Sequence, residues 1–269
     1  MKTMSKIYTA LIFIVLYAPI AVMILFSFNK SESTGVFSGF SLDWYKELFR
    51  DSATLEALKN TLVLAVASAV ISTIIGTVAA VGISKLKSKY AQNTITSVTN
   101  IPMMNPDIVT GISMMLLFVF VSKALGMSQS LSFTTVLIAH ITFNLPYVML
   151  SVTPKIRQMD KHLTEAAMDL GCTPFQAFRK VEFPAIVPGI ISGFIMAFTL
   201  SLDDFVISYF TTGNGFETLP IRIYSMTKKR VTPDMYALST LIFIAVLVLL
   251  ILSNLAQGDG EKKKGRAKK

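Results

Sequence analysis

The chain has 269 residues and a formal net charge of +9; 52% of its residues are hydrophobic and only 15% are charged. Soluble globular domains carry roughly 25% charged residues, so this composition argues against an ordinary soluble enzyme, and the abundance of apolar side chains excludes a disordered chain. Cys172 is the only cysteine, which excludes an intrachain disulfide and a thiolate metal cage.

Long apolar blocks without Lys or Arg recur along the chain, each close to the roughly 20 residues that a transmembrane helix requires. They show no β-type alternation, so helices are the expected spanning structure. A signal peptide is the alternative for the first block, but its apolar run is long and no Ala-x-Ala site follows it. The sequence predicts an all-α integral membrane protein with six transmembrane helices, at residues 7–28, 62–84, 103–122, 133–154, 185–207 and 237–256.

The distribution of basic residues predicts the orientation of these helices. With both termini in the cytoplasm, inside segments hold sixteen Lys and Arg residues and outside segments hold nine, as the positive-inside rule requires. Six of the sixteen lie in the tail, so the expected domains are a transmembrane domain at 1–256 and a basic cytoplasmic tail at 257–269. The basic residues flank apolar blocks, which favours anionic lipid over nucleic acid as their partner.

Two polar features precede the middle of the chain. The outside segment 29–61 contains the only tryptophan, Trp44, in a short amphipathic stretch. It is either an aromatic anchor at the membrane interface or a lid whose indole face meets an ammonium group. Asp107 follows Asn105 and Pro106 beside the third block, where an acid either begins a helix or serves a function within the membrane.

The inside segment 155–184 predicts a helix–glycine–helix elbow. Apolar residues share one face of its first helix, and Gly171 follows as a C-terminal stop. The second helix begins with three signals, which are an N-cap, a first-position proline and a capping-box partner: Thr173, Pro174 and Gln176. We expect this second helix to end before Pro184.

Asp203 and Asp204 are consecutive acids near the outer end of the fifth predicted helix. On a helix they would point about 100° apart, so both cannot face lipid, and at least one is expected to face a polar cavity. Spaced carboxylates of this kind suit a cation with several ammonium groups. On the same helix, Gly189 and Gly193 allow close helix contact with an unidentified partner. His140 in the fourth block has no ligand-spaced neighbour, so hydrogen-bonded packing is favoured over metal binding.

The elbow carries the most specific pattern in the chain. Glu165-Ala166-Ala167, three residues, Gly171, nine residues and then Val181-x-Phe183-Pro184 resemble the EAA signature of ABC importer permeases. Val181 and Phe183 replace the Ile and Leu of that family. The resemblance implies the type I ABC importer permease fold.

The resemblance also implies partners and roles. The elbow would be a coupling helix that docks into a cytoplasmic ATPase, with Glu165 reaching basic groups, Ala166 and Ala167 permitting close approach, and Gly171 and Pro184 completing the motif. The chain has no Gly-x4-Gly-Lys-Ser/Thr phosphate loop, so it is expected to be a transport subunit without an ATPase site. Two ATPase subunits would bind Mg and hydrolyse ATP, beside a second permease subunit and an extracytoplasmic binding protein in a bacterial inner membrane.

Further strings resemble the PotC-type permeases of spermidine/putrescine importers: Ser-Leu-x-Trp-Tyr, Asn-Pro-Asp and Ser-Leu-Asp-Asp-Phe-Val-Ile-Ser-Tyr-Phe. This resemblance implies polyamine import, with Trp44, Asp107, Ser201, Asp203 and Asp204 in the substrate pathway. Importers of iron, sulfate or thiamine share the implied fold and remain alternatives. An intramembrane aspartyl protease and an ion-coupled secondary transporter are more remote, since neither would explain the elbow.

Overall fold

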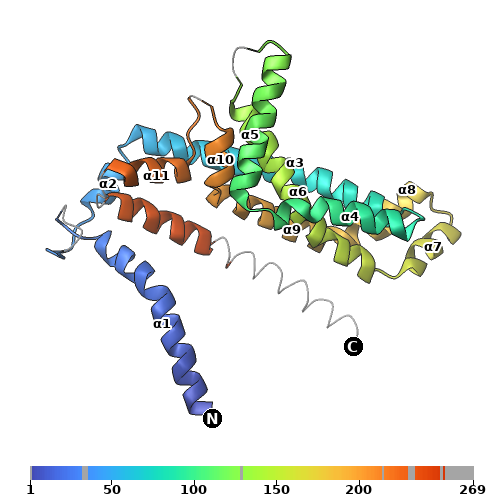
Figure 1. Cartoon of the computed structure of the whole chain (residues 1–269). Helices are drawn as coiled ribbons and strands as arrows, with labels where there is room; N and C mark the ends of the chain where they lie inside the picture. Colours follow the sequence, from blue (N-terminus) through green and yellow to red (C-terminus); the bar gives the residue numbers. More distant parts are fainter. Residues whose placement is uncertain are drawn as a thin grey trace. The chain divides into compact units, whose positions relative to one another are not determined.

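The computed structural model describes residues 2–31, 36–127, 130–213, 215–229, 234–248 and 251. Within these ranges the named secondary-structure elements are all helical (Figure 1). The chain divides into two units, one of residues 1–58 and 219–250 and one of residues 59–218 and 251–269. Helix α3 (Ser52–Ser84) begins in the first unit and continues into the second.

The first unit contains α1 (Lys2–Phe26), α2 (Asp43–Leu48), α11 (Leu219–Lys229) and a helix at Asp234–Val248. Its core is small and is formed by Leu48, Ala57, Leu219 and Leu238. The guanidinium of Arg222 lies 3.3 Å from the carboxylate of Asp51 and ties α11 to the start of α3. The apolar side chains of α1 are exposed along the helix, as expected for a lipid-facing span.

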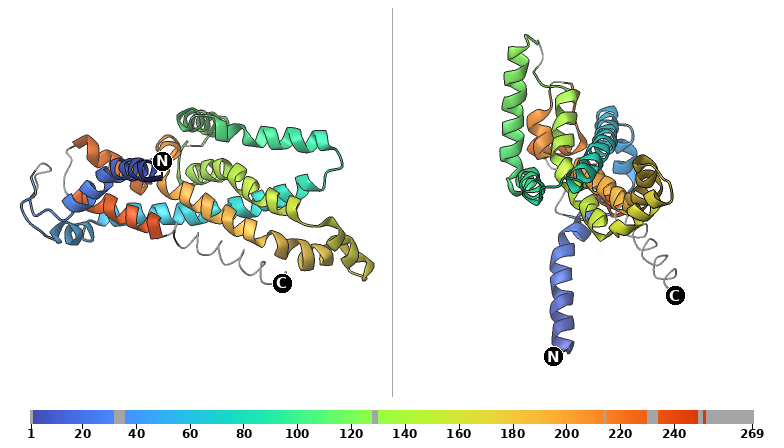
Figure 2. Two further views of the ribbon diagram at one scale, coloured as in Figure 1. Left: turned by 90° about the horizontal axis from the view of Figure 1, so that it is seen from below. Right: turned by 90° about the vertical axis from the view of Figure 1, so that its right-hand side faces the viewer.

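The second unit is a bundle of longer helices. It contains α4 (Lys89–Met104), α5 (Asp107–Ala124), α6 (Phe133–Gln158), α7 (Lys161–Asp169), α8 (Pro174–Ala177), the π-helix η1 (Phe178–Glu182), α9 (Phe183–Asp203) and α10 (Val206–Thr211). Helices α6 and α9 lie side by side in both views of Figure 2. Buried residues of α3, α6 and α9, among them Ala69, Val148 and Ala197, form its main core.

Small residues permit this close helix packing. A Cβ atom on Gly189 would lie 2.9 Å from the Ser151 backbone oxygen of α6, and one on Gly76 of α3 would lie 2.8 Å from a Val148 methyl group. Gly193 also faces Val148. The Gly-x3-Gly pair of α9 therefore packs against α6, which the sequence did not identify.

Among the residues that the structure describes, five helices are long and apolar enough to cross a membrane: Lys6–Phe26, Ser52–Ser84, Asp107–Ala124, Phe133–Gln158 and Pro174–Asp203. They correspond to the first five predicted spans. The sixth, predicted at 237–256, is represented by the apolar helix Asp234–Val248, and most of residues 249–256 lie outside the described ranges, as does the tail.

Two predicted spans have different boundaries in the structure. The span at 103–122 is interrupted, because α4 ends at Met104 and Asn105 and Pro106 are extended before α5 begins at Asp107. A proline disfavours the helical conformation of the residue that precedes it. Pro106 therefore explains why the helix is broken at Asn105. The span at 185–207 is also interrupted, because α9 ends at Asp203, Asp204 is extended, and α10 follows.

The predicted helix end before Pro184 is wrong. Residues Pro174–Asp203 form one continuous helical stretch, in which η1 joins α8 to α9. Pro184 occupies the first turn of α9. A proline lacks an N–H donor, and the altered hydrogen-bond register of a π-helix directly before it accommodates that loss. The second arm of the elbow is therefore the beginning of a spanning helix.

Candidate functional site

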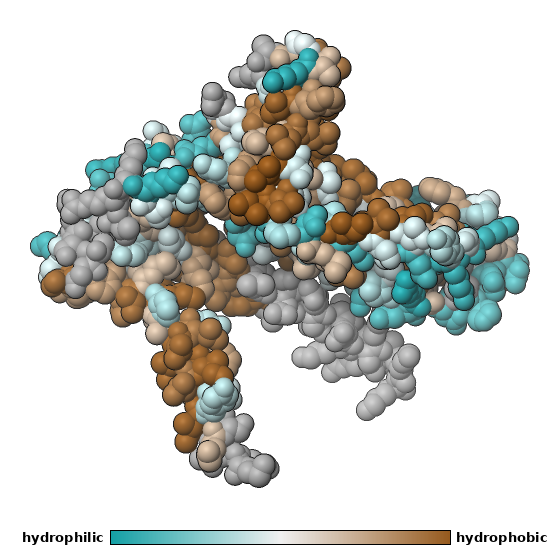
Figure 3. Space-filling model, in the orientation of Figure 1, coloured by the Kyte–Doolittle hydropathy of each residue, from teal (hydrophilic) through white to brown (hydrophobic). Residues whose placement is uncertain are grey.

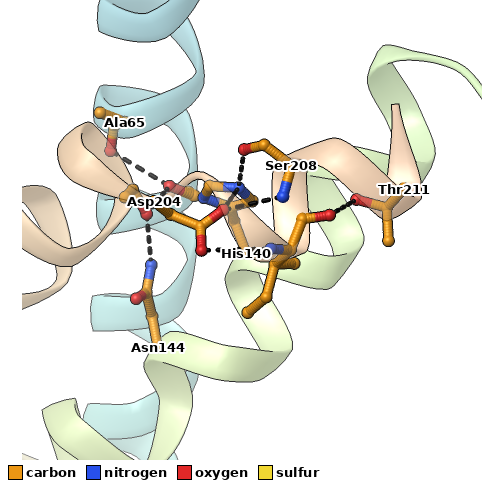
Figure 4. Close-up of polar contacts among 9 residues, drawn as sticks. Ala65, His140, Asn144, Asp204, Ser208 and Thr211 are labelled. Carbon is orange, nitrogen blue, oxygen red and sulfur yellow. Dashed lines mark hydrogen bonds and ion pairs between the residues drawn. The ribbon is translucent and has the colours of Figure 1, made fainter. Parts of the chain in front are cut away.

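A buried polar network surrounds Asp204 where α9 gives way to α10. The Asp204 carboxylate accepts hydrogen bonds from the backbone N–H groups of Ser208 at 2.8 Å and Ile207 at 3.3 Å. The His140 Nε2 atom of α6 lies 3.4 Å from the same carboxylate and 2.9 Å from the Ser208 hydroxyl. Figure 4 shows Asp204 between His140 and Ser208. These interactions anchor the first turn of α10 to α6.

A second chain of hydrogen bonds joins three helices beside this network. The amide nitrogen of Asn144 donates to the Ser201 hydroxyl at 2.8 Å, and Ser201 lies 2.9 Å from the Ser68 hydroxyl of α3. All three side chains are buried. Buried hydroxyl and amide groups are costly unless they are paired, so this chain fixes α3, α6 and α9 in register. It gives Ser201 a structural role.

The helix break places the two consecutive acids in opposite surroundings. The Asp204 side chain is only 9% exposed, whereas Asp203, the last residue of α9, is exposed. Among the described residues, Asp203 forms no ion pair. The premise that both acids lie on one helix is therefore wrong. The Asp204 carboxylate is occupied by the N–H groups of α10, which ends α9 and leaves Asp203 at its tip.

Asp107 is exposed in the first turn of α5, where a carboxylate is favoured by the helix dipole. The structure thus gives Asp107 the helix-start position that the sequence offered.

Trp44 lies in α2 of the first unit and is half-buried. Its indole N–H donates to the Asn29 backbone oxygen at 2.7 Å. Asn29 and Phe40 form an isolated antiparallel bridge, and the Asn29 side chain accepts from the Ser38 N–H. The indole therefore fastens α2 to this loop, a contact that either earlier interpretation of Trp44 permits.

The elbow has the predicted local structure up to α8. Gly171 has a φ of +88°, its N–H donates to the Met168 oxygen, and the Cys172 N–H donates to the Ala167 oxygen. This pair of bonds is a Schellman motif, and the positive φ explains the glycine. Thr173 and Gln176 form the predicted capping box. The glycine stop and the capping box are both confirmed.

The elbow presents its motif residues to solvent. Glu165 and Ala166 are exposed and Ala167 is partly exposed; Glu165 lies 3.1 Å from the His162 ring on the same helix. Pro184 is exposed at the start of α9. Figure 3 shows this end of the second unit covered by hydrophilic side chains, whereas α5 presents a hydrophobic surface. The elbow is therefore open for a protein contact.

Sequence reasoning missed the pairing of His140 with Asp204. The two residues are 64 positions apart, and the only signal was that each was a polar residue in an apolar block. It also missed helix α4, most of which lies between the predicted spans 62–84 and 103–122. Among the predicted site residues, the structure gives Ser201 partners on α3 and α6 and gives Asp204 a contact with His140.

Comparisons with known proteins agree on one class. Residues 72–258 match the family described as binding-protein-dependent transport system inner membrane component. The chain is 38% identical to the putrescine transport system permease protein PotI of Escherichia coli strain K12, over 94% of this chain and 90% of that one. It is 37% identical to the spermidine/putrescine transport system permease protein PotC of the same strain, over 93% and 92%.

Solved structures show the same fold. A bacterial ABC transporter involved in the import of the polysaccharide alginate aligns with a TM-score of 0.74 and 17% identity, covering 96% of this chain and 95% of its own. An amino acid ABC transporter aligns with a TM-score of 0.58 and 21% identity, covering 82% and 100%. The all-helical architecture is that of importer permeases.

Proposed function

The chain belongs to the family of binding-protein-dependent transport system inner membrane components, and we propose that it imports a polyamine such as putrescine or spermidine. Members of this family are multi-pass permease subunits of ABC importers, in which the ATPase is a separate subunit. The chain is therefore a transport subunit and not an enzyme. The relatives that are 37–38% identical to it are named for putrescine or spermidine transport.

The observation that carries the proposed cargo is the exposed carboxylate of Asp203 at the tip of a spanning helix. An exposed charge in a membrane segment is costly unless it faces water or a cation. Asp107 is a second exposed acid, at the start of α5. Carboxylates bind ammonium ions through charge-assisted hydrogen bonds, so Asp203 and Asp107 suit a linear cation with several amino groups.

Asp204 and Ser201 contribute to the pathway by holding its helices in place. The bonds from α10 to Asp204 end α9 at Asp203, and Ser201 holds this end of α9 to α3 and α6. Trp44 is assigned to the outer entrance, where its indole would meet the cation. Binding at these groups is expected to be weak, because the cargo must leave again.

The elbow is the coupling element of the proposal. Glu165, Ala166, Ala167, Gly171 and Pro184 would contact one ATPase subunit, while a second permease subunit completes the pathway and a second ATPase subunit pairs with the first. An extracytoplasmic binding protein would deliver the cargo; one structural neighbour was solved with its own periplasmic protein. Both termini and the basic tail 257–269 would then lie in the cytoplasm, with the permease domain at 1–256.

Uptake of labelled spermidine and putrescine by proteoliposomes tests the proposal. The vesicles hold the complete importer and its binding protein, with ATP inside. Asp203→Asn is expected to lower uptake at least about tenfold, as for loss of one charge-assisted contact, while ATPase activity remains. Glu165→Lys is expected to abolish uptake by disrupting coupling. Absence of polyamine uptake in the wild type, with ATP hydrolysis intact, would contradict the cargo and retain the family.

A further inference from the structure

A basic cavity of about 540 Å³ lies between the end of α3, α4, α6 and the elbow helix α7. Its lining includes four cations, which are Lys85, Lys87, Lys89 and Arg157. It lies wholly within the second unit. None of the pathway residues Ser201, Asp203 and Asp204 lines it, so it is separate from the cargo site.

The charges of this cavity do not cancel internally. Its lining also holds two acids: Glu182, which lies 2.9 Å from Lys85, and Glu165, which lies 3.1 Å from the exposed ring of His162. Among the described residues, Lys87, Lys89 and Arg157 form no ion pair. The lining therefore has an excess of two positive charges, and a bound anion would relieve the repulsion between its cations.

The walls of the cavity hold the start of a helix and one unpaired hydroxyl at fixed positions. Helix α4 begins at Lys89, so the positive end of its dipole is at the cavity. Gln92 donates to the Leu86 oxygen at 2.7 Å and to the Ser84 oxygen at 3.4 Å, which holds the connection between α3 and α4 in place. The Thr164 hydroxyl of α7 is buried in the cavity wall and has no hydrogen-bond partner.

We propose that this cavity binds a phosphate-bearing anion, with Lys87, Lys89 and Arg157 as its main ligands. Free phosphate and the headgroup of an anionic phospholipid share this chemistry, and basic pockets beside spanning helices are suited to headgroups. Because Thr164, Glu165 and Met168 of the elbow form one wall, a bound anion would tie α7 to the connection between α3 and α4. Its placement in the cytoplasmic leaflet rests on the proposed function, whereas anion binding does not.

Native mass spectrometry of the full-length chain in detergent tests the site, with phosphatidylglycerol and phosphatidylcholine of identical acyl chains as probes. We expect phosphatidylglycerol to bind in preference to phosphatidylcholine. The variant Lys87→Gln/Lys89→Gln/Arg157→Gln is expected to weaken phosphatidylglycerol binding at least about tenfold, because it removes three cations that attract the anionic headgroup. Displacement by millimolar inorganic phosphate would identify free phosphate as a sufficient ligand, and persistence of the lipid would identify the headgroup.

The matched control Lys6→Gln/Arg179→Gln/Lys180→Gln removes the same charge from exposed residues outside the cavity. It is expected to leave lipid binding within about twofold of the wild type. Equal weakening by both triple variants, or by neither, would overturn the site. The charge-retaining variant Lys87→Arg/Lys89→Arg/Arg157→Lys should bind like the wild type, and failure of this folded variant to bind would also overturn it. This experiment measures lipid binding and not uptake, so a negative result would contradict the anion site without contradicting the proposed cargo.

Discussion

The surroundings of Asp204 and those of Glu165 are opposite in kind, although both acids belong to the strongest motifs of the chain. Asp204 is buried, and His140 and the N–H groups of α10 satisfy its carboxylate. Glu165 is exposed on α7 and contacts only its helical neighbour His162 among the interactions described. A motif acid whose bonds are complete maintains the fold, whereas one left open is available to a partner.

The largest expected effect separates these two acids by stability. Asp204→Ala leaves the buried N–H groups of Ile207 and Ser208 without their acceptor, and it is expected to lower the free energy of unfolding by about 2–6 kcal/mol, at roughly 1–3 kcal/mol for each unpaired donor. Glu165→Ala is expected to change it by less than about 0.5 kcal/mol. Denaturant unfolding in detergent micelles measures both, with Asp203→Ala as the adjacent exposed control. Equal losses for Asp204→Ala and Glu165→Ala would break the comparison.

The next effect concerns a packed glycine. Gly189→Ala places a methyl group against the Ser151 backbone oxygen, which cannot shift cheaply, so a loss of about 1–3 kcal/mol is expected. Gly82 is also helical, but a Cβ there meets no atom within 4 Å. Gly82→Ala is the matched control and is expected to be neutral or slightly stabilising. Thermal unfolding measures the melting temperatures of the two variants in parallel. Equal shifts of both melting temperatures would refute the packing argument.

A smaller effect is expected at the elbow glycine, where conformation and not contact is decisive. No atom lies near a Cβ on Gly171, but its φ of +88° is unfavourable for other residues. Gly171→Ala is expected to cost about 1–2 kcal/mol locally. Gly171→Asn should cost less, because asparagine tolerates this conformation better. Hydrogen exchange of α7 and α8 amides measures the loss, and identical exchange in both variants would contradict this explanation.

The smallest effect tests the ion pair of Asp51 and Arg222, whose exposure lies between that of Asp204 and that of Glu165. The Thr54 hydroxyl, with the Ala53 N–H and Arg222, holds the pKa of Asp51 below its usual 3.8 despite partial burial. A depressed folded-state pKa stabilises the fold above the unfolded pKa, and this contribution is lost as pH falls through the folded value. Because the site is about one-third exposed, the contribution should stay below about 1 kcal/mol.

The stability difference between wild type and Asp51→Asn is therefore expected to be largest above about pH 5 and to shrink below about pH 3. Chemical unfolding at several pH values measures this difference. A difference that does not change over that range would show that the hydrogen bonds of Asp51, and not its charge, stabilise the first unit.

Local sequence signals determined most of the architecture. Apolar length alone predicted five of the observed spans, because a helix that crosses a bilayer needs a long run of apolar side chains. The glycine stop and capping box of the elbow were predictable from Gly171, Thr173 and Gln176, since these interactions join residues within a few positions of each other. The family was inferred from the spacing of the motif between Glu165 and Pro184, which is also contained in one short stretch of the sequence.

Only the tertiary structure decided what lies between distant segments. The fifth predicted span is interrupted at Asp204, whose carboxylate accepts from N–H groups of α10 and contacts His140 of α6, so a buried acid is separated from an exposed one although the sequence shows two identical neighbours. Likewise, Gly189 acquired its partner α6, and the basic residues Lys87, Lys89 and Arg157 met around one cavity. Such contacts depend on how helices pack, and no local propensity or hydropathy pattern encodes which faces meet.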